Sequence, residues 1–383
     1  MKKKIIILVN ELSFLISHRL EIVTTAKKKG YNVKVIYGEL GGVNSDVLSR
    51  EGIDCIQLPL KRGSFNPLRE LWSLYSIIKT FNRIKPNIVH LITTKSILYG
   101  GIAARIVKIP CVVTAIAGLG SFFHKRNIRN FFFQKLLFPI FYLAFNHPNQ
   151  CVIVQNLEDK KILVDWGVLN EKKVFLIKGS GVNLVEFKNF EEQKNVFTVC
   201  YASRLLRDKG VLDFVSAAKI LKKRGLKIKF LLAGSLDSSN STSLTELELQ
   251  NIIKEKVVEV LGFQHDIPSL YSRSNIVCLP SYFGEGIPKA LIQAAAACRA
   301  VVTTDHPGCR DAIIPNKTGL LVPIKSPRIL ADKIKWLMDN PKARVAMGKA
   351  GRLLAESEFP VEKIVKRHLN IYQNLLEKSY QKN

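Results

Sequence analysis

Short apolar runs of the kind that form buried β-strands alternate with longer helical patterns along nearly the whole chain. Such alternation is typical of parallel sheets in which a covering helix follows each strand. The runs fall into two sets, and each set can build one doubly wound sheet. The sequence therefore predicts an α/β protein with two Rossmann-like domains that face a cleft. The expected strands cover residues 5–9, 32–37, 55–59, 88–92, 111–115, 150–155 and 174–178 in the first set, and residues 198–202, 228–233, 257–261, 276–279, 300–304 and 319–322 in the second.

A polar stretch without a clear periodic pattern, residues 183–195, separates the two sets. We therefore expect an N-terminal domain over residues 1–187 and a C-terminal domain over residues 188–360. The helix expected within residues 361–383 would then pack back on the first domain. Ligands of such sheets bind beyond the carboxyl ends of the strands, so a cleft between the domains would collect the loops that follow them.

The composition is that of a folded protein, because 47% of the 383 residues are hydrophobic and 23% are charged. The seven cysteines show no close pair such as C-x-x-C, which favours a reducing, cytoplasmic compartment over a disulfide framework. The apolar run 5–9 is too short for the core of a signal peptide and is expected to be the first strand.

A formal net charge of +27 indicates an anionic partner. No Asp or Glu occurs in residues 71–157, and the Phe-rich segment 121–145 lies within this basic stretch. Lys and Arg interrupt the segment too often for it to span a bilayer, which needs about 20 apolar residues. We expect it to dock on an anionic membrane surface, as in a peripheral protein on the inner face of the cytoplasmic membrane. A buried core helix is the alternative, and nucleic acid ranks well below both because no nucleic-acid motif is present.

The most informative motif follows the expected strand at residues 276–279. Gly284 and Gly286 flank Glu285 in a tight loop, and a helix is expected to start near Ile287 with Pro288 in its first turn. A glycine loop at a helix N-terminus directs free backbone N–H groups at one point, which suits a phosphate or the hydroxyls of a sugar. An ordinary strand-to-helix turn is the alternative.

A second motif, SRLLRDKG at residues 203–210, places Arg204 and Lys209 directly after another expected strand. The two cations suit a diphosphate, Arg through its planar fork and Lys as a point charge. Loop cations are more often simply solvated, but the Glu285 loop makes the phosphate interpretation the better one.

With these motifs in place, residues 62–123 and 201–312 resemble the retaining glycosyltransferases of family 4, which have the GT-B fold. The combination of NPL, YGG and GLGSF with EGIPKALIQAAA most resembles the branch that extends undecaprenyl-diphosphate-linked oligosaccharides. The resemblance implies a nucleotide-diphosphate sugar, with UDP as the expected nucleotide, held by the C-terminal domain. It also implies a polyprenyl-diphosphate-linked saccharide as the acceptor, held by the N-terminal domain.

By the same resemblance, Arg204 and Lys209 match the pair that binds the diphosphate. Glu285 matches the first Glu of the family's Glu-x7-Glu signature, which contacts the donor sugar. The backbone of Gly286 and Ile287 would add N–H donors. Catalysis would therefore depend on Glu285, Arg204 and Lys209, with retention of configuration.

The sequence departs from the family pattern on the donor side at Gln293 and at Cys298, and the AIAGLG loop lacks the His that many members place near the donor sugar. The second signature Glu, which usually meets the ribose, is Gln293 here, and an uncharged amide should bind the ribose hydroxyls less strongly. Cys298 stands where the family has Gly, which suggests altered local packing. In the GFQHDI motif, Phe263 matches the loop that flanks the base, and Asp266 is expected to cap a helix.

On the acceptor side, the resemblance points to the start of the first helix and to two strand-end loops. His18, Arg19 and Lys95 match positions that face the acceptor, although a helix residue with only local hydrogen bonds is an equal alternative for His18. Gly118 and Gly120 would let the backbone approach the substrate.

Neither H-E-x-x-H nor DxD spacing occurs, so no metal ligand and no required cofactor is expected. A nucleotide-sugar epimerase of the same fold, or a non-catalytic membrane- or polysaccharide-binding paralogue, are the alternative functions. The transferred sugar, the linkage, the acceptor saccharide and the oligomeric state stay open at this point.

Overall fold

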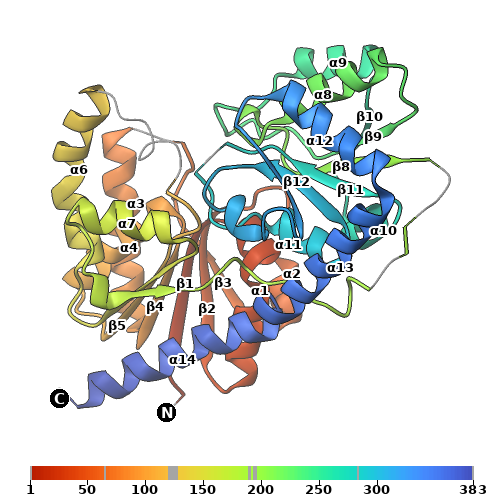
Figure 1. Ribbon diagram of the computed structural model, residues 1–383. Helices are drawn as coiled ribbons and strands as arrows, with labels where there is room; N and C mark the ends of the chain where they lie inside the picture. The colour runs from red at the N-terminus through yellow and green to blue at the C-terminus, as the bar shows by residue number, and fades with distance from the viewer. Residues whose placement is uncertain are drawn as a thin grey trace. The chain divides into compact units, whose positions relative to one another are not determined.

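The computed structural model describes residues 2–63, 66–119, 128–188, 191–192, 196–282 and 284–381, with the side chains of residues 128–134 and 136 outside the description. The chain divides into two compact units (Figure 1). The first domain combines Met1–Ser180 with Glu362–Asn383, and the second consists of Gly181–Val361. The second domain begins before the expected boundary at residue 187 because Phe187 is buried in its core beside Tyr271.

The first domain contains a seven-stranded parallel sheet in the order β3-β2-β1-β4-β5-β6-β7. Its central strands are buried along their whole length, as expected of a sheet covered on both faces. The seven strands expected in this half are confirmed, with bounds that differ by a few residues. The strands are β1 (Lys4–Glu11), β2 (Asn32–Glu39), β3 (Asp54–Gln57), β4 (Ile88–Ile92), β5 (Cys111–Ala115), β6 (Gln150–Val154) and β7 (Val174–Leu176).

Helices cover both faces of this sheet. On one face α3, α4 and α6 pack side by side (Figure 1). Val89 and Leu91 of β4 share a core with Phe81 of α3 and Phe145 of α6. His90 lies between Val89 and Leu91 and therefore points to the other face, where it contacts α14. The helices of this domain are α1 (Leu12–Lys28), α2 (Asp46–Arg50), α3 (Pro67–Ile84), α4 (Thr94–Ile106), α6 (Ile128–Phe145), α7 (Leu157–Asp165) and α14 (Val361–Tyr380).

The second domain contains a six-stranded parallel sheet in the order β10-β9-β8-β11-β12-β13. Its six expected strands are also confirmed. The strands are β8 (Thr198–Ala202), β9 (Lys229–Ala233), β10 (Glu259–Gly262), β11 (Ile276–Leu279), β12 (Ala300–Thr304) and β13 (Gly319–Val322). The helices are α8 (Val211–Lys223), α9 (Glu246–Lys254), α10 (Ile267–Ser272), α11 (Lys289–Ala296), α12 (Pro327–Asp339) and α13 (Pro341–Glu358).

The Phe-rich segment 121–145 forms α6 from Ile128 onward, while residues 121–127 lie outside the described residues. Phe141 and Phe145 are buried in the domain core, so this part of the helix fits the alternative of a core helix. Ile140, Tyr142 and Leu143 are exposed on the same helix. Within the described part of the chain, no helix has the length and the apolar character needed to cross a membrane.

Candidate functional site

The loop after β8 carries the first pair of predicted cations. Tyr201 is buried in β8 and donates a hydrogen bond from its hydroxyl to the carbonyl of Arg204, 3.1 Å away. The loop also bonds to the end of β9, through Ser203 N to Ala233 O at 3.1 Å, and to the loop after β11, through Tyr282 N to Asp208 O at 2.9 Å. The sequence thus places this loop at the carboxyl ends of β8, β9 and β11, where ligands of parallel sheets bind.

Lys209 and Glu285, predicted separately from two motifs, form an ion pair. Both side chains are largely buried, with 10% and 12% of their surfaces exposed. The other carboxylate oxygen of Glu285 accepts a hydrogen bond from the hydroxyl of Ser281 at 2.6 Å, and Ser281 is itself fully buried. Glu285 therefore fixes the position of the Lys209 ammonium, which has three hydrogens and can donate to further acceptors.

Arg204 forms an ion pair with Asp237, with 2.6 Å between Nη1 and Oδ2. Asp237 follows β9 and is held by the hydroxyl of Ser239 at 2.7 Å and by a bond from its own N–H to the hydroxyl of Ser243 at 3.0 Å. Arg204 stays 44% exposed, so its guanidinium remains accessible to a ligand. Sequence reasoning missed Asp237, although the segment GSLDSSNS directly after a strand was a signal for a polar loop.

Glycines allow the loops of this site to pack backbone against backbone. Gly210 has a φ of 74°, and a Cβ there would lie 2.0 Å from the carbonyl oxygen of Pro280. A Cβ at Gly308, after β12, would lie 1.9 Å from the carbonyl oxygen of Gly286. Since neither position has room for a side chain, these glycines keep the Lys209 loop and the Glu285 loop in place.

The helix that follows the Glu285 loop begins later than expected. Pro288 has a ψ of 124°, which is extended, so it caps α11 and the helix begins at Lys289. The side chain of Ile287 is buried in the core, which leaves only its backbone available to a ligand. Gln293 lies on α11 and is partly exposed.

An exposed aromatic side chain follows the edge strand β10. Phe263 is 62% exposed, and its ring packs edge-on against His265 with 4.7 Å between the ring centroids. Gly262, the residue before it, accepts a hydrogen bond from Gly234 N at 2.8 Å, so Phe263 belongs to the same group of loops. Asp266 caps α10 through a bond from Ser269 N at 2.9 Å, as expected.

Cys298 occupies a backbone conformation that favours glycine. It lies two residues after the end of α11 with a φ of 58°, the left-handed region in which helices commonly end at Gly. A Cβ at Gly348 of α13 would lie 2.1 Å from the carbonyl oxygen of Cys298. Cys298 thus contacts α13, close to Gly348.

The acceptor-side residues predicted from the sequence lie in the first domain. His18 of α1 is partly exposed, stacks on Phe14 with 4.4 Å between ring centroids, and lies 2.6 Å from the Ser17 hydroxyl. Lys95 of α4 donates to Glu70 at 2.7 Å and to the carbonyl of Lys61 at 2.9 Å.

The expectation that Arg19 faces the acceptor is wrong. Arg19 is only 2% exposed, because the periodicity of α1 turns it toward the sheet and α14 rather than toward solvent. Gly118 has a φ of 117°, which suits glycine in the loop after β5, while Gly120 lies outside the described residues.

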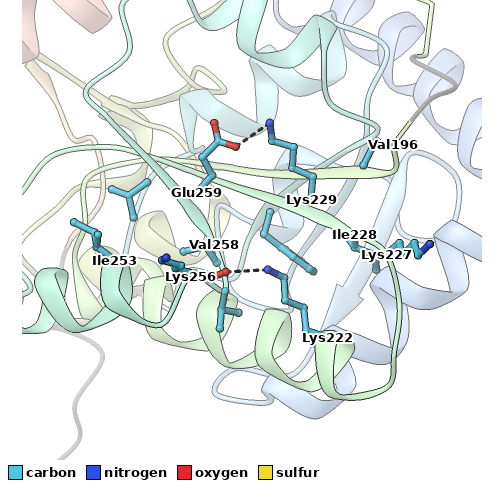
Figure 2. A pocket seen from close by; sticks show the side chains of 12 residues that line it. Val196, Lys222, Lys227, Ile228, Lys229, Ile253, Lys256, Val258 and Glu259 are labelled. Carbon is cyan, nitrogen blue, oxygen red and sulfur yellow. Dashed lines mark hydrogen bonds and ion pairs between the residues drawn. The ribbon is translucent and has the colours of Figure 1, made fainter.

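Two cavities of similar size lie away from the predicted donor-binding residues. One, of about 600 Å³, lies at the other end of the second sheet from the site, beside the start of β9 (Figure 2). Two of the lysines that line it bond to neighbouring residues. Lys222 donates a hydrogen bond to the carbonyl of Lys256 at 3.0 Å, and Lys229 forms an ion pair with Glu259 at 2.8 Å. The other, of about 630 Å³, lies in the first domain and is lined by Arg69 and Trp72 among others. In the described ranges, no three His, Cys, Asp or Glu side chains are grouped as metal ligands would be.

Comparison with known families identifies the class of protein to which the two domains belong. The model of glycosyl transferase 4-like proteins matches residues 4–156, in the first domain, and that of glycosyl transferases group 1 matches residues 184–354, in the second. The chain belongs to the glycosyltransferases. Each of its two domains is thus matched over most of its length by a domain type of these enzymes.

Curated relatives of this glycosyltransferase act on lipid-linked saccharides according to their names. The chain is 28% identical to the N,N'-diacetylbacillosaminyl-diphospho-undecaprenol alpha-1,3-N-acetylgalactosaminyltransferase of Campylobacter jejuni, over 85% of this chain and 87% of the relative. It is 24% identical to the UDP-Gal:alpha-D-GlcNAc-diphosphoundecaprenol alpha-1,3-galactosyltransferase of Escherichia coli, over 90% of each chain.

Solved structures share the fold of this glycosyltransferase. The sucrose-phosphate synthase of Thermosynechococcus elongatus superposes with a TM-score of 0.79 and 20% identity, covering 98% of this chain and 100% of that one. The Anabaena protein HepE, solved in complex with UDP, superposes with a TM-score of 0.76 and 18% identity, covering 98% and 100%. The predicted GT-B fold class, with two Rossmann-like parallel sheets, is confirmed.

Proposed function

We propose that this glycosyltransferase moves a hexose or N-acetylhexosamine from a UDP-sugar to a polyprenyl-diphosphate-linked saccharide, with retention of configuration. The observation that carries the proposal is the Lys209–Glu285–Ser281 arrangement beside Arg204, in the loops that follow parallel strands. The names of both relatives specify diphospho-undecaprenol acceptors, one relative's name specifies a UDP-sugar donor, and one structural neighbour binds UDP. The resulting pathway class is the assembly of cell-surface polysaccharide or glycan.

The chemistry of the donor explains the need for two cations. When the sugar leaves, negative charge grows on the oxygen of the diphosphate, and preorganised positive groups stabilise that charge without rearranging. Lys209 is held in place by Glu285, and Arg204 by Asp237. We infer that Lys209 and Arg204 bind the diphosphate and that the Glu285 loop binds the sugar.

The reaction we propose takes place on one face of the sugar. The bond between the anomeric carbon and the diphosphate oxygen breaks, and the acceptor hydroxyl forms a new bond to the same carbon from the same side. The hydroxyl proton goes to an oxygen of the departing β-phosphate. The enzyme then contributes mainly by positioning the substrates and neutralising the leaving group, which requires no metal or further cofactor.

For the nucleoside we propose a site next to the same loops. Phe263 offers an exposed ring for stacking on the base. Gln293 would accept from the ribose hydroxyls in place of the second signature Glu. In the first domain, His18, Lys95 and Gly118 are the residues that we propose for the acceptor, while Arg19 is left out because it is buried.

An acceptor with a lipid tail must be reached at a membrane, and we propose that α3 and α6 form the membrane-facing surface of the first domain. Leu68, Leu71, Trp72 and Tyr75 of α3 are 78%, 63%, 58% and 52% exposed, an unusual apolar stripe for one helix. Exposed cations follow at Lys79 and Arg83. Aromatic and apolar side chains beside cations suit the interface of an anionic bilayer, which is where a peripheral protein of the inner face of the cytoplasmic membrane would lie.

The activity is tested with a panel of UDP-sugars and a synthetic polyprenyl-diphosphate saccharide, with products identified by mass and the new linkage by NMR. We expect one sugar to be added and the anomeric configuration of the donor to be kept, with EDTA causing no loss. Conversion of a UDP-sugar to its epimer without acceptor would instead identify an epimerase. Calorimetry that detects no nucleotide-sugar binding would favour a non-catalytic paralogue.

The membrane surface is tested by flotation with vesicles that contain anionic phospholipid. We expect the wild type to float and a Leu71→Ser/Trp72→Ser variant to stay in the lower fraction. Leu353→Ser, which changes an equally exposed leucine (67%) of the second domain, serves as the matched control. Equal flotation of all three proteins would assign the membrane contact to another surface.

A further inference from the structure

A group of buried polar side chains lies within the first domain, on the face of the sheet that α1 and α14 cover. It consists of Arg19 of α1, His90 of β4, and His368 and Tyr372 of α14, all at most 2% exposed. The His90 ring centroid lies 5.8 Å from that of His368 and 5.7 Å from that of Tyr372. We call these four residues the Arg19 cluster.

Four nitrogen atoms of the Arg19 cluster have no hydrogen-bonding partner among the described residues. They are Nε and Nη1 of Arg19, Nε2 of His90 and Nε2 of His368. Buried polar groups in folded proteins are almost always satisfied, so several unpaired nitrogens in one place indicate a bound water or ion.

The charge of Arg19 favours an ion over water. Burial lowers the pKa of Arg19 to about 10, and the group that opposes this effect is the hydroxyl of Tyr372, not a carboxylate. A guanidinium nevertheless stays protonated near neutral pH, and a buried charge without a counterion is strongly unfavourable. Nothing else in the Arg19 cluster carries a negative charge at that pH.

Another buried arginine, Arg299, has protein groups as partners. Arg299 of the second domain is fully buried and donates to the main-chain carbonyls of Tyr271 and Glu191, at 2.9 and 3.1 Å. The carboxylate of Glu192 also raises its pKa against the lowering effect of burial. Arg19 has neither kind of partner in the part of the chain that the structure describes.

The hydrogen bonds of the two histidines determine which atoms can donate. His90 Nδ1 lies 2.6 Å from the Tyr372 hydroxyl, and when the hydroxyl donates this bond, Nε2 of His90 carries the hydrogen. His368 Nδ1 lies 2.9 Å from the carbonyl of Ile364 and must donate to it, so Nε2 of His368 carries a lone pair. The guanidinium has five N–H donors, enough to serve both an anion and this lone pair.

We propose that the Arg19 cluster is a binding site for a small monovalent anion of the halide class, coordinated by Arg19 and by Nε2–H of His90. The anion neutralises the guanidinium and joins α1 to α14, so that its binding stabilises the docking of the C-terminal helix on the first domain. The site is separate from the donor site, which lies in the second domain, and its existence does not depend on the proposed transfer reaction.

The direct test is crystallography of the full chain with bromide, whose anomalous scattering distinguishes it from water. We expect a bromide peak within hydrogen-bonding distance of Arg19 and His90. An ordinary water at this place, without anomalous signal, would overturn the proposal.

A second test measures Tm in solution, with sodium bromide compared to sodium gluconate at equal ionic strength. We expect Tm to rise on the order of 2–4 °C more in bromide between about 10 and about 200 mM salt, because a ligand that binds only the folded state stabilises it. Arg19→Met, which keeps side-chain length without the charge, should abolish this difference. Arg50→Met, a change at an exposed arginine of the same domain, should keep it. Equal Tm values of the wild type in both salts would contradict the proposal, even if Arg19→Met failed to fold.

Discussion

Lys209 and Glu285 form a largely buried ion pair that joins the loop after β8 to the loop after β11. The two residues are far apart in the sequence and belong to separate motifs. A buried lysine needs such a partner, because an unpaired ammonium in this place would be costly. The same pair also directs the ammonium to the carboxyl end of the sheet, where we propose that the diphosphate binds.

The first prediction concerns Lys209. Lys209→Met should lower kcat by roughly 100- to 1000-fold, the range seen when one preorganised charge-stabilising group is removed. KM for the acceptor should change little, because the acceptor is proposed to bind the first domain. Steady-state kinetics with saturating acceptor measure both values. Lys219→Met, at an exposed lysine paired with Glu255, is the control and should behave as wild type. Unchanged kcat in Lys209→Met would remove this cation from the mechanism.

The second prediction separates binding from stability at Arg204. Because the side chain is 44% exposed, its ion pair with Asp237 contributes little to folding, and Arg204→Met should leave Tm nearly unchanged. The affinity for UDP, measured by calorimetry, should fall about tenfold, as expected for one lost charge-assisted contact of about 1.4 kcal/mol. Asp237→Asn should weaken UDP binding less, because it frees the guanidinium without removing it. A large loss of Tm in Arg204→Met would assign the residue a structural role.

The third prediction uses the strained position after α11. Cys298→Gly relieves the left-handed backbone but removes a buried side chain, so we expect a change within about 1 kcal/mol of zero in the free energy of unfolding. Cys298→Ala also loses the sulfur and keeps the strain. It should therefore be less stable than Cys298→Gly in urea unfolding, and the reverse order would show that packing of the β-carbon outweighs the relief of the backbone.

The fourth prediction is a pH dependence of stability. Burial, and then the charge of Arg19, lowers the pKa of His368 to about 3, and burial also lowers that of His90. The unfolded chain, with histidine pKa values near about 6.5, binds protons more readily below that pH, so the free energy of unfolding should fall as pH decreases from about 6.5 toward 3. His368→Gln should remove about 1.4 kcal/mol per pH unit from this slope in denaturant titrations. Arg19 and Tyr372 keep their charge states over this range, and so does the exposed Arg367, the neighbour of His368 in the sequence. The ring of His90, whose pKa burial also lowers, lies 5.8 Å from that of His368. An unchanged slope would mean that His368 is protonated in the folded protein.

The strands could be predicted because strands buried on both faces of a parallel sheet appear in the sequence as short apolar runs, as in residues 88–92 and 300–304. The loops of the proposed donor site could be placed in the fold for the same reason, since they follow strands of this kind. The pairing of Lys209 with Glu285 could not, because side-chain partners across distant loops leave no periodic signal.

Arg19 shows the main limit of sequence reasoning in this chain. The family resemblance placed Arg19, which follows His18 on α1, toward the acceptor. Its burial depends on Tyr372 and His368 of α14, which are brought to the same place only by the tertiary fold. Asp237 was missed for a similar reason, because an acidic residue in a polar loop is ordinary until Arg204 is seen beside it.

The first domain is interrupted by the second, because Glu362–Asn383 complete the core that Met1–Ser180 begin. On the ribosome, the segment that supplies His368 and Tyr372 is made only after the entire second domain. Until then α14 cannot cover His90 and Arg19, while all six strands of the second domain are already available to pair. We therefore expect the second domain to complete its folding before the first, although synthesis of the first domain begins earlier.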